Sequence, residues 1–244
     1  MKKIILILLT ALFFTNAFCQ VDSIPVKYHK RIDISNRPGD HLMFQFSSDH
    51  LTGMPDSISS HQSGFSRGFN AYLMTDRPFK GSPKFSIGIG IGVGSTNITF
   101  KKLNVDLRST HTLLPFTHVD SADHFKKYKL SLSYAEIPLE FRFSSNPTNP
   151  NKSWKIAIGG KVGTLINAHT KGKDLQSKNN VTINTYTEKE NSKKYFNSTR
   201  FMATARIGYG IFSLFGAYQL NTVLKDIAGP AMKVYQVGIT LSGL

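Results

Sequence analysis

Most of this chain consists of short segments in which apolar and polar side chains alternate. Within residues 232–242, one face would carry Tyr235, Val237, Ile239 and Leu241. The other face would carry Gln236, Gly238, Thr240 and Ser242. A period of two indicates a β-strand with one apolar face. Nearly every segment repeats this pattern, and no amphipathic helix is available to cover the apolar faces. A closed barrel in a membrane meets that requirement, because lipid tolerates neither open strand edges nor unpaired backbone groups.

The pattern predicts about eight strands, at residues 41–48, 67–76, 83–94, 128–143, 153–166, 199–209, 211–220 and 232–242. We therefore expect an all-β fold, an antiparallel up-and-down transmembrane β-barrel closed between its first and last strands. Side chains predicted to face lipid include Ile87, Ile89, Ile91, Leu139, Phe141, Ile156, Ile158, Val237, Ile239 and Leu241. A change of phase near Tyr134 predicts a bulge in the fourth strand, with Leu130 and Leu132 facing outward before it.

The connections between these strands alternate in length. Residues 77–82, 144–152 and 209–210 are short, whereas four connections are longer and polar: 49–66, 95–127, 167–198 and 221–231. This alternation is typical of barrels with short periplasmic turns and long extracellular loops. The structural alternative is a soluble sandwich, in which a second sheet would cover the apolar faces.

The N-terminal residues resemble an export signal, with basic Lys2 and Lys3 before an apolar stretch that is too short to span a bilayer. We expect a signal peptide at 1–19, an extended periplasmic leader at 20–40 and the barrel domain at 41–244. Lipidation of Cys19 is the alternative, although Phe18 suits it poorly. Cleavage after Cys19 would leave no cysteine, which excludes disulfides and thiolate chemistry in the remaining chain.

The chain is strongly basic, with a formal net charge of +15. An exported protein seldom meets nucleic acid, so we expect the phosphates and carboxylates of outer-membrane lipid and lipopolysaccharide to be the partner. The alternative is a solvated loop surface without a particular ligand. The lysines concentrate in the predicted loops and at strand ends, as Lys126, Lys127, Lys129, Lys171, Lys173, Lys178, Lys189, Lys193 and Lys194.

A second group of charges lies on the predicted inner face of the middle strands: Glu136, Glu140, Arg142, Lys155, Lys161 and Arg206. The interior of an eight-stranded barrel is just wide enough for side chains to fill it. Buried charges must pair, so these residues predict a salt-bridged polar network that plugs the lumen. A small pore is the alternative.

The long second loop contains His111, His118, Asp120, Ser121, Asp123 and His124. Some small outer-membrane barrels are lipid A hydrolases or acyltransferases, and a Ser–His–Asp set can be drawn from these residues. Nothing in the sequence fixes their mutual geometry. The spacings between the histidines also match no common metal-ligand pattern. We therefore predict no catalytic residues, no cofactor and no metal, and keep a lipid-modifying enzyme as the alternative.

The segment Tyr134-Ala-Glu-Ile-Pro-Leu-Glu-Phe-Arg-Phe143 resembles a recurrent segment of the PorT-like outer-membrane β-barrel family. The resemblance implies a barrel in the cell outer membrane of a Gram-negative bacterium that has an alternative protein-secretion system. It carries over no catalytic residues. We expect a monomeric, non-enzymatic envelope protein with basic extracellular loops and a surface-binding or secretion-associated role, with cell-envelope or secretion proteins as candidate partners.

Overall fold

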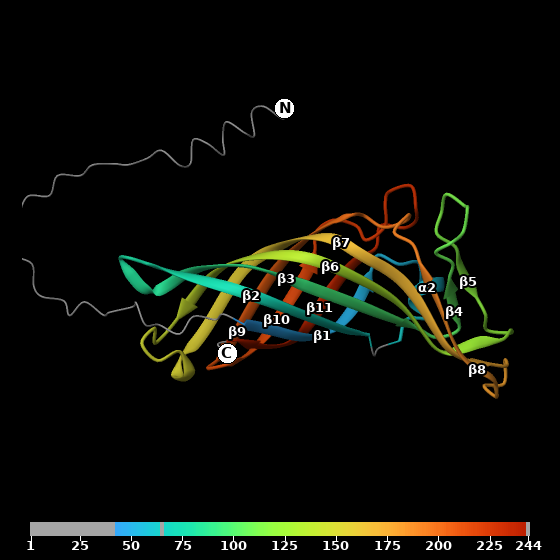
Figure 1. The fold of residues 1–244 in the computed structure, drawn as a ribbon, viewed down its shortest axis with the longest axis horizontal. Coiled ribbons are helices and arrows are strands. Elements are labelled where there is room, and N and C mark those ends of the chain that lie inside the picture. The colour runs from blue at the N-terminus through green and yellow to red at the C-terminus, as the bar shows by residue number, and fades with distance from the viewer. Residues whose placement is uncertain (1–41, 64–65, 243–244) are drawn as a thin grey trace, which may run out of the picture. The chain divides into compact units, whose positions relative to one another are not determined.

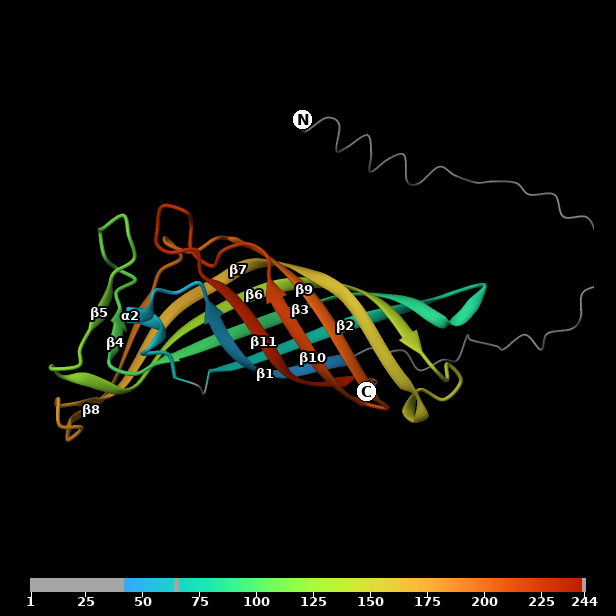
Figure 2. The same ribbon diagram turned by 180° about the vertical axis from the view of Figure 1, so that it is seen from behind.

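The computed structural model describes residues 42–63 and 66–242. The predicted signal peptide at 1–19 and leader at 20–40 lie outside the described residues. Within the described part, eight antiparallel strands form a closed barrel (Figures 1 and 2). They are β1 (Leu42–Thr52), β2 (Arg67–Phe79), β3 (Ser82–Phe100), β6 (His124–Ser144), β7 (Trp154–Gln176), β9 (Thr199–Tyr209), β10 (Phe212–Gln219) and β11 (Lys233–Ser242).

The barrel closes between its first and last strands. β1 pairs with β11 from Met43 opposite Ser242 to Thr52 opposite Lys233. On the other side of the barrel, β6 pairs with β7 over almost their whole length. These pairings leave none of the eight described strands with a free edge across the wall, so the predicted fold class is confirmed.

The two ends of the barrel differ in their connections (Figures 1 and 2). One end has the short turns, including a single 3₁₀ turn at Pro150–Lys152. The other end has the long loops, which contain α2 (Asp56–Ser59), the hairpin of β4 (Leu103–Val105) and β5 (Phe116–His118), and β8 (Thr182–Asn191). β3, β6 and β7 continue past the rest of the wall toward this end, and β8 pairs with the projecting part of β7. Parts of the predicted loops 95–127 and 167–198 are therefore strand.

The predicted change of phase in the fourth strand is wrong. Even-numbered residues of β6 are buried from Tyr128 to Ser144, and Leu130 and Leu132 are 3% and 1% exposed. The irregularity lies instead in the partner strand, where Ser133 pairs with Asn167 but Tyr134 pairs with Leu165. The extra residue, Ile166 of β7, absorbs the bulge. The two leucines face inward because the interior is apolar at the long-loop end.

The outer face of the barrel is apolar. Nine of the ten side chains predicted to face lipid are exposed there, and Leu241 is half-buried on the same face. Soluble monomers rarely expose contiguous apolar patches of this extent. The exposed residues are Ile87, Ile89, Ile91, Leu139, Phe141, Ile156, Ile158, Val237 and Ile239.

Candidate functional site

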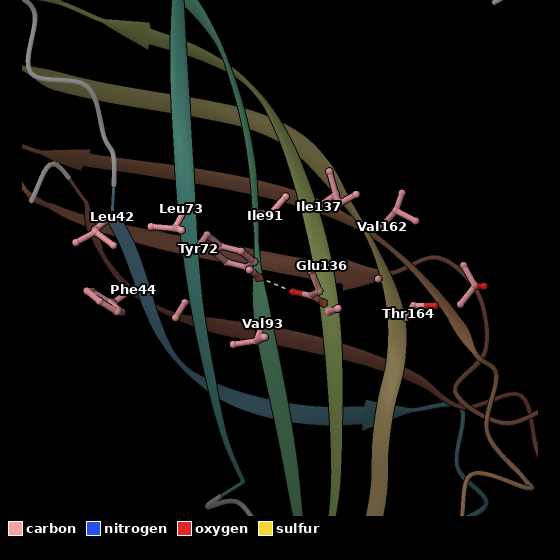
Figure 3. Close-up of a pocket in the computed structure, with 15 residues that line it drawn as sticks. Leu42, Phe44, Tyr72, Leu73, Ile91, Val93, Glu136, Ile137, Val162 and Thr164 are labelled. Carbon is pink, nitrogen blue, oxygen red and sulfur yellow. Dashed lines mark hydrogen bonds between the residues drawn. The ribbon is translucent and has the colours of Figure 1, made fainter.

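Inside the barrel, the carboxylate of Glu136 on β6 lies at the centre of a buried charge cluster. The Lys161 Nζ of β7 lies 3.2 Å from a Glu136 oxygen, and the Arg200 guanidinium of β9 contacts the other oxygen. The Tyr72 hydroxyl of β2 donates a hydrogen bond to the same carboxylate. Figure 3 shows Tyr72 and Glu136 joined in this way. The cluster therefore links four strands through one carboxylate.

Neighbouring polar side chains extend this cluster across the lumen. Lys161 also donates to Gln236, whose amide donates to the Asp49 carboxylate at 3.1 Å. The Arg200 guanidinium lies 3.8 Å from the centroid of the Tyr134 ring and donates to the Thr96 hydroxyl. Glu136 is thus paired with Lys161 and Arg200, and Asp49 accepts hydrogen bonds from Ser47 and Gln236, so the charges of this cluster have the partners that burial requires.

A second cluster lies nearer the short-turn end, around Glu140. One Glu140 oxygen accepts from the Arg142 Nε at 2.8 Å and from the Arg206 Nη2 at 3.0 Å. Arg142 also lies 3.6 Å from the Asp76 carboxylate. A β-carbon at Gly88 would lie 2.5 Å from the Arg142 guanidinium, so this glycine of β3 leaves the room that the arginine occupies.

The long-loop end of the lumen is filled by apolar side chains. Leu130 and Leu132 of β6 pack there with residues of β3, with Ile58 of α2 and with Leu103 and Val105 of β4. The interior thus has three layers, two charged and one apolar. This packing is what an eight-stranded barrel can accommodate.

The structure buries all six residues predicted for the lumen network. It brings Glu136 to Lys161, and Glu140 to Arg142 and Arg206, while Lys155 is buried on the same inner face. Sequence reasoning missed Arg200, Asp49 and Asp76. The parity of β9 could have identified Arg200, because it shares the inner face with Arg206.

On the outer wall, lysines face one another across three adjacent strands. Lys171 of β7 pairs with Lys129 of β6 on one side and with Lys189 of β8 on the other. Lys127 and Lys173 form the next pair along β6 and β7. Like charges directly opposite each other destabilise a sheet, so the fold alone does not explain this row.

A cleft of about 690 Å³, called here the basic cleft, is lined by four of these lysines: Lys127, Lys129, Lys171 and Lys173. Lys189 pairs with Lys171 but is not part of the lining. Among the described residues, the lining of the cleft contains no acid: Ser63, Arg67, Asn97, Thr99, Lys127, Tyr128, Lys129, Lys171 and Lys173. Burial, together with the charge of Lys171, lowers the pKa of Lys129. Burial lowers the pKa of nearby His169 too, with further contributions from Lys189, Lys129 and Lys171. The neighbouring lysine charges contribute to both pKa shifts after burial, and a bound anion would offset that contribution.

The basic cleft lies beyond the apolar band, on the side of the long loops. On β6 the last large exposed apolar side chain is that of Ile137, and Lys129 follows farther along the same face. The band itself includes a shallow apolar groove of about 720 Å³. Figure 3 shows Leu73, Ile91 and Val162 among its lining side chains.

The polar residues of the second long loop go to different places. His111 is exposed, whereas His124 is buried with its Nε2 3.2 Å from the Asn180 side-chain oxygen. His118 and Asp120 instead approach His61, which follows α2. Ser121 and Asp123 are exposed. The structure therefore does not assemble the Ser–His–Asp set that the sequence allowed.

Within residues 42–63 and 66–242, no helix is long and apolar enough to cross a bilayer. Comparison with known families matches residues 35–228 to a family described as outer membrane protein beta-barrel domain. No curated protein and no solved structure matches the chain. The matched residues cover most of the chain and include seven of its eight barrel strands. The chain therefore belongs to the outer membrane protein beta-barrel domain family, and its location is the cell outer membrane.

Proposed function

We propose that this barrel is a non-enzymatic surface protein that binds the phosphate and carboxylate groups of lipopolysaccharide in its basic cleft. The observation that carries the proposal is the row Lys129–Lys171–Lys189 on the outer wall. Repulsion between these lysines destabilises the protein when no anion is bound. An anion bound between the lysines would neutralise that repulsion.

The height of the row on the barrel suits this ligand. Lys129 lies ten residues along β6 from Leu139, which pairs with Ile89 within the apolar band. At about 2.5 Å of depth per tilted residue, that separation is roughly 25 Å. This depth lies beyond the hydrocarbon and within the headgroup and sugar layer of the outer leaflet. The direction toward the outer leaflet follows from the long loops on that side.

Binding can be tested with purified full-length protein in detergent and with lipopolysaccharide, intact or chemically dephosphorylated. The variant combines Lys129→Gln, Lys171→Gln and Lys189→Gln. A control of equal charge combines Lys80→Gln, Lys84→Gln and Lys152→Gln, three exposed lysines near the short turns. At about 1 kcal/mol per lysine, the cleft variant should bind intact lipopolysaccharide roughly 100-fold more weakly, and the control should bind like the wild type. Equal affinity of the cleft variant and the wild type would reject the proposal.

The filled lumen supports a binding role over a pore. A continuous water path would have to pass Glu136 and Glu140, both held in ion pairs, and then the apolar cluster around Leu130. We expect planar-bilayer recordings to show no steady openings. Large, sustained conductance would favour the pore instead.

We also propose the narrower PorT-like assignment, supported by the segment Tyr134–Phe143. Within it, Glu136 and Glu140 supply the central carboxylates of both buried clusters. A secretion-associated role rests on this resemblance. Loss of secreted proteins from the culture medium of a deletion strain, restored by the wild-type gene, is the expected result, and unchanged secretion would argue against that role.

A further inference from the structure

Three side chains with metal-binding atoms meet on the long-loop end of the barrel. His61 follows α2, His118 ends β5, and Asp120 lies two residues farther on. One ligand atom from each residue lies within 4.8 Å of the other two. The His61 Nε2 lies 3.1 Å from an Asp120 carboxylate oxygen, and the two imidazole rings have centroids 4.8 Å apart.

The hydrogen bonds of His61 show which of its nitrogens faces the cluster. Its Nδ1 lies 2.9 Å from the Ser57 carbonyl oxygen, which can only accept, and 3.0 Å from the Ser60 hydroxyl, which can donate or accept. The tautomer that donates to the carbonyl carries its proton on Nδ1. In the neutral ring Nε2 then presents a lone pair, and this lone pair faces the carboxylate of Asp120. Two acceptors at this distance need a proton or a cation between them. A backbone carbonyl on the second nitrogen is also the usual support of a metal-bound histidine.

The position of His118 favours a cation over a simple proton. A proton shared by His61 and Asp120 would not require a second imidazole at the same point. Two ligands on one tetrahedral Zn²⁺ lie about 3.3 Å apart, close to the observed separation of His61 and Asp120. His118 and Asp120 are exposed, so small rotations of their side chains can close the remaining gap.

The backbone already holds the two loop segments together. The Lys101 amide donates to the His61 carbonyl at 2.9 Å, and the Val119 amide donates to the Lys102 carbonyl at 3.0 Å. Residues 61 and 118–120 are thus attached to the same short segment. A metal ion would bind a framework that exists before it arrives, which lowers the entropic cost of binding.

From this geometry we propose that His61, His118 and Asp120 form a Zn²⁺ site that ties the first extracellular loop to the second. Two imidazoles and one carboxylate suit Zn²⁺ and related transition metals better than Mg²⁺ or Ca²⁺, which prefer oxygen ligands. Three protein ligands leave one coordination position for water. The site is separate from the basic cleft, whose lining residues include none of the three.

The test is calorimetric titration of ZnCl₂ into the full-length, tag-free, chelator-treated protein in detergent. The variants are His61→Ala and His118→Ala, and the control is His111→Ala, which removes an exposed histidine of the same loop. We expect one Zn²⁺ per chain in the wild type and the control, and at least about 10-fold weaker binding in both variants. Zn²⁺ should also slow proteolysis of residues 101–123 in the wild type and in His111→Ala, but not in His61→Ala or His118→Ala.

Two results would contradict the proposed site. The first is a wild-type affinity for Zn²⁺ no greater than that of His61→Ala and His118→Ala. The second is a loss of Zn²⁺ affinity in His111→Ala as large as the loss in those two variants. Because all three residues lie in loops outside the barrel wall, the variants should keep the heat-modifiable gel migration of the folded protein. A variant that loses this migration is replaced by Asp120→Asn, for which the same loss of Zn²⁺ affinity is expected.

Discussion

Substitution of Ile89 by arginine tests whether hydrocarbon contacts the outer wall. Ile89 lies on the outer face of β3, midway between Phe85 and Val93, and is 49% exposed. A strand residue rises about 3.3 Å, and a tilt of about 40° reduces this to about 2.5 Å of depth. Ile89 therefore lies about 10 Å from each of the other two residues. Because the apolar band of such barrels is about 25 Å tall, Ile89 lies near its centre.

An arginine at this depth should lower the free energy of unfolding by about 2–4 kcal/mol. The assay is equilibrium unfolding by urea from phospholipid vesicles, followed by the fluorescence of Trp154, the chain's single tryptophan. The control is Ile227→Arg, because Ile227 is 71% exposed but belongs to a long loop. We expect the control to change stability by no more than about 0.5 kcal/mol. Equal losses at the two positions would refute the placement of lipid against β3.

Three further results are expected. Glu136→Gln should lower the free energy of unfolding by about 3–5 kcal/mol in the same assay, because it leaves the buried Lys161 and Arg200 without their carboxylate. A loss below about 1 kcal/mol would contradict the ion pairing inside the barrel. Gly90→Ala should lower the free energy of unfolding by about 1–3 kcal/mol, because the new β-carbon would lie 2.4 Å from a backbone oxygen of β2. The control Gly81→Ala should leave stability nearly unchanged, because its β-carbon would have no atom within 4 Å. The pKa of His169, lowered by burial and nearby lysines, should rise toward about 6.5 when intact lipopolysaccharide binds, as NMR titration of the imidazole would show; an unchanged pKa would argue against an anion in the basic cleft.

Alternation along the strands was sufficient to predict the barrel, its closure and its outer face. It predicts faces well because successive side chains of a strand point to opposite sides. The alternation does not indicate whether the apolar face of a strand points to lipid or to the interior at a given position along the barrel axis. The apolar character of Leu130 and Leu132 predicts that they face lipid, whereas the interior itself is apolar near the long loops. Parity followed continuously from Glu136 would have placed both leucines inside.

Contacts between distant segments were harder to predict. The His61 side chain approaches His118 only because α2 and the β4–β5 hairpin fold over the same end of the barrel. Histidine spacing within the second long loop predicts no metal site, because spacing in one loop cannot reveal a ligand that comes from the first long loop. The row of lysines could not be predicted from the sequence either, because Lys189 lies opposite Lys171 only through the pairing of β8 with β7.

The most direct test of the closed barrel in the outer membrane is the gel migration of the full-length protein from isolated outer membranes, with and without boiling. A closed barrel resists unfolding by detergent until it is heated, so the unboiled protein should be found in this fraction and should migrate faster than the boiled protein. Recovery in the soluble periplasmic fraction, with identical migration before and after boiling, would contradict the account.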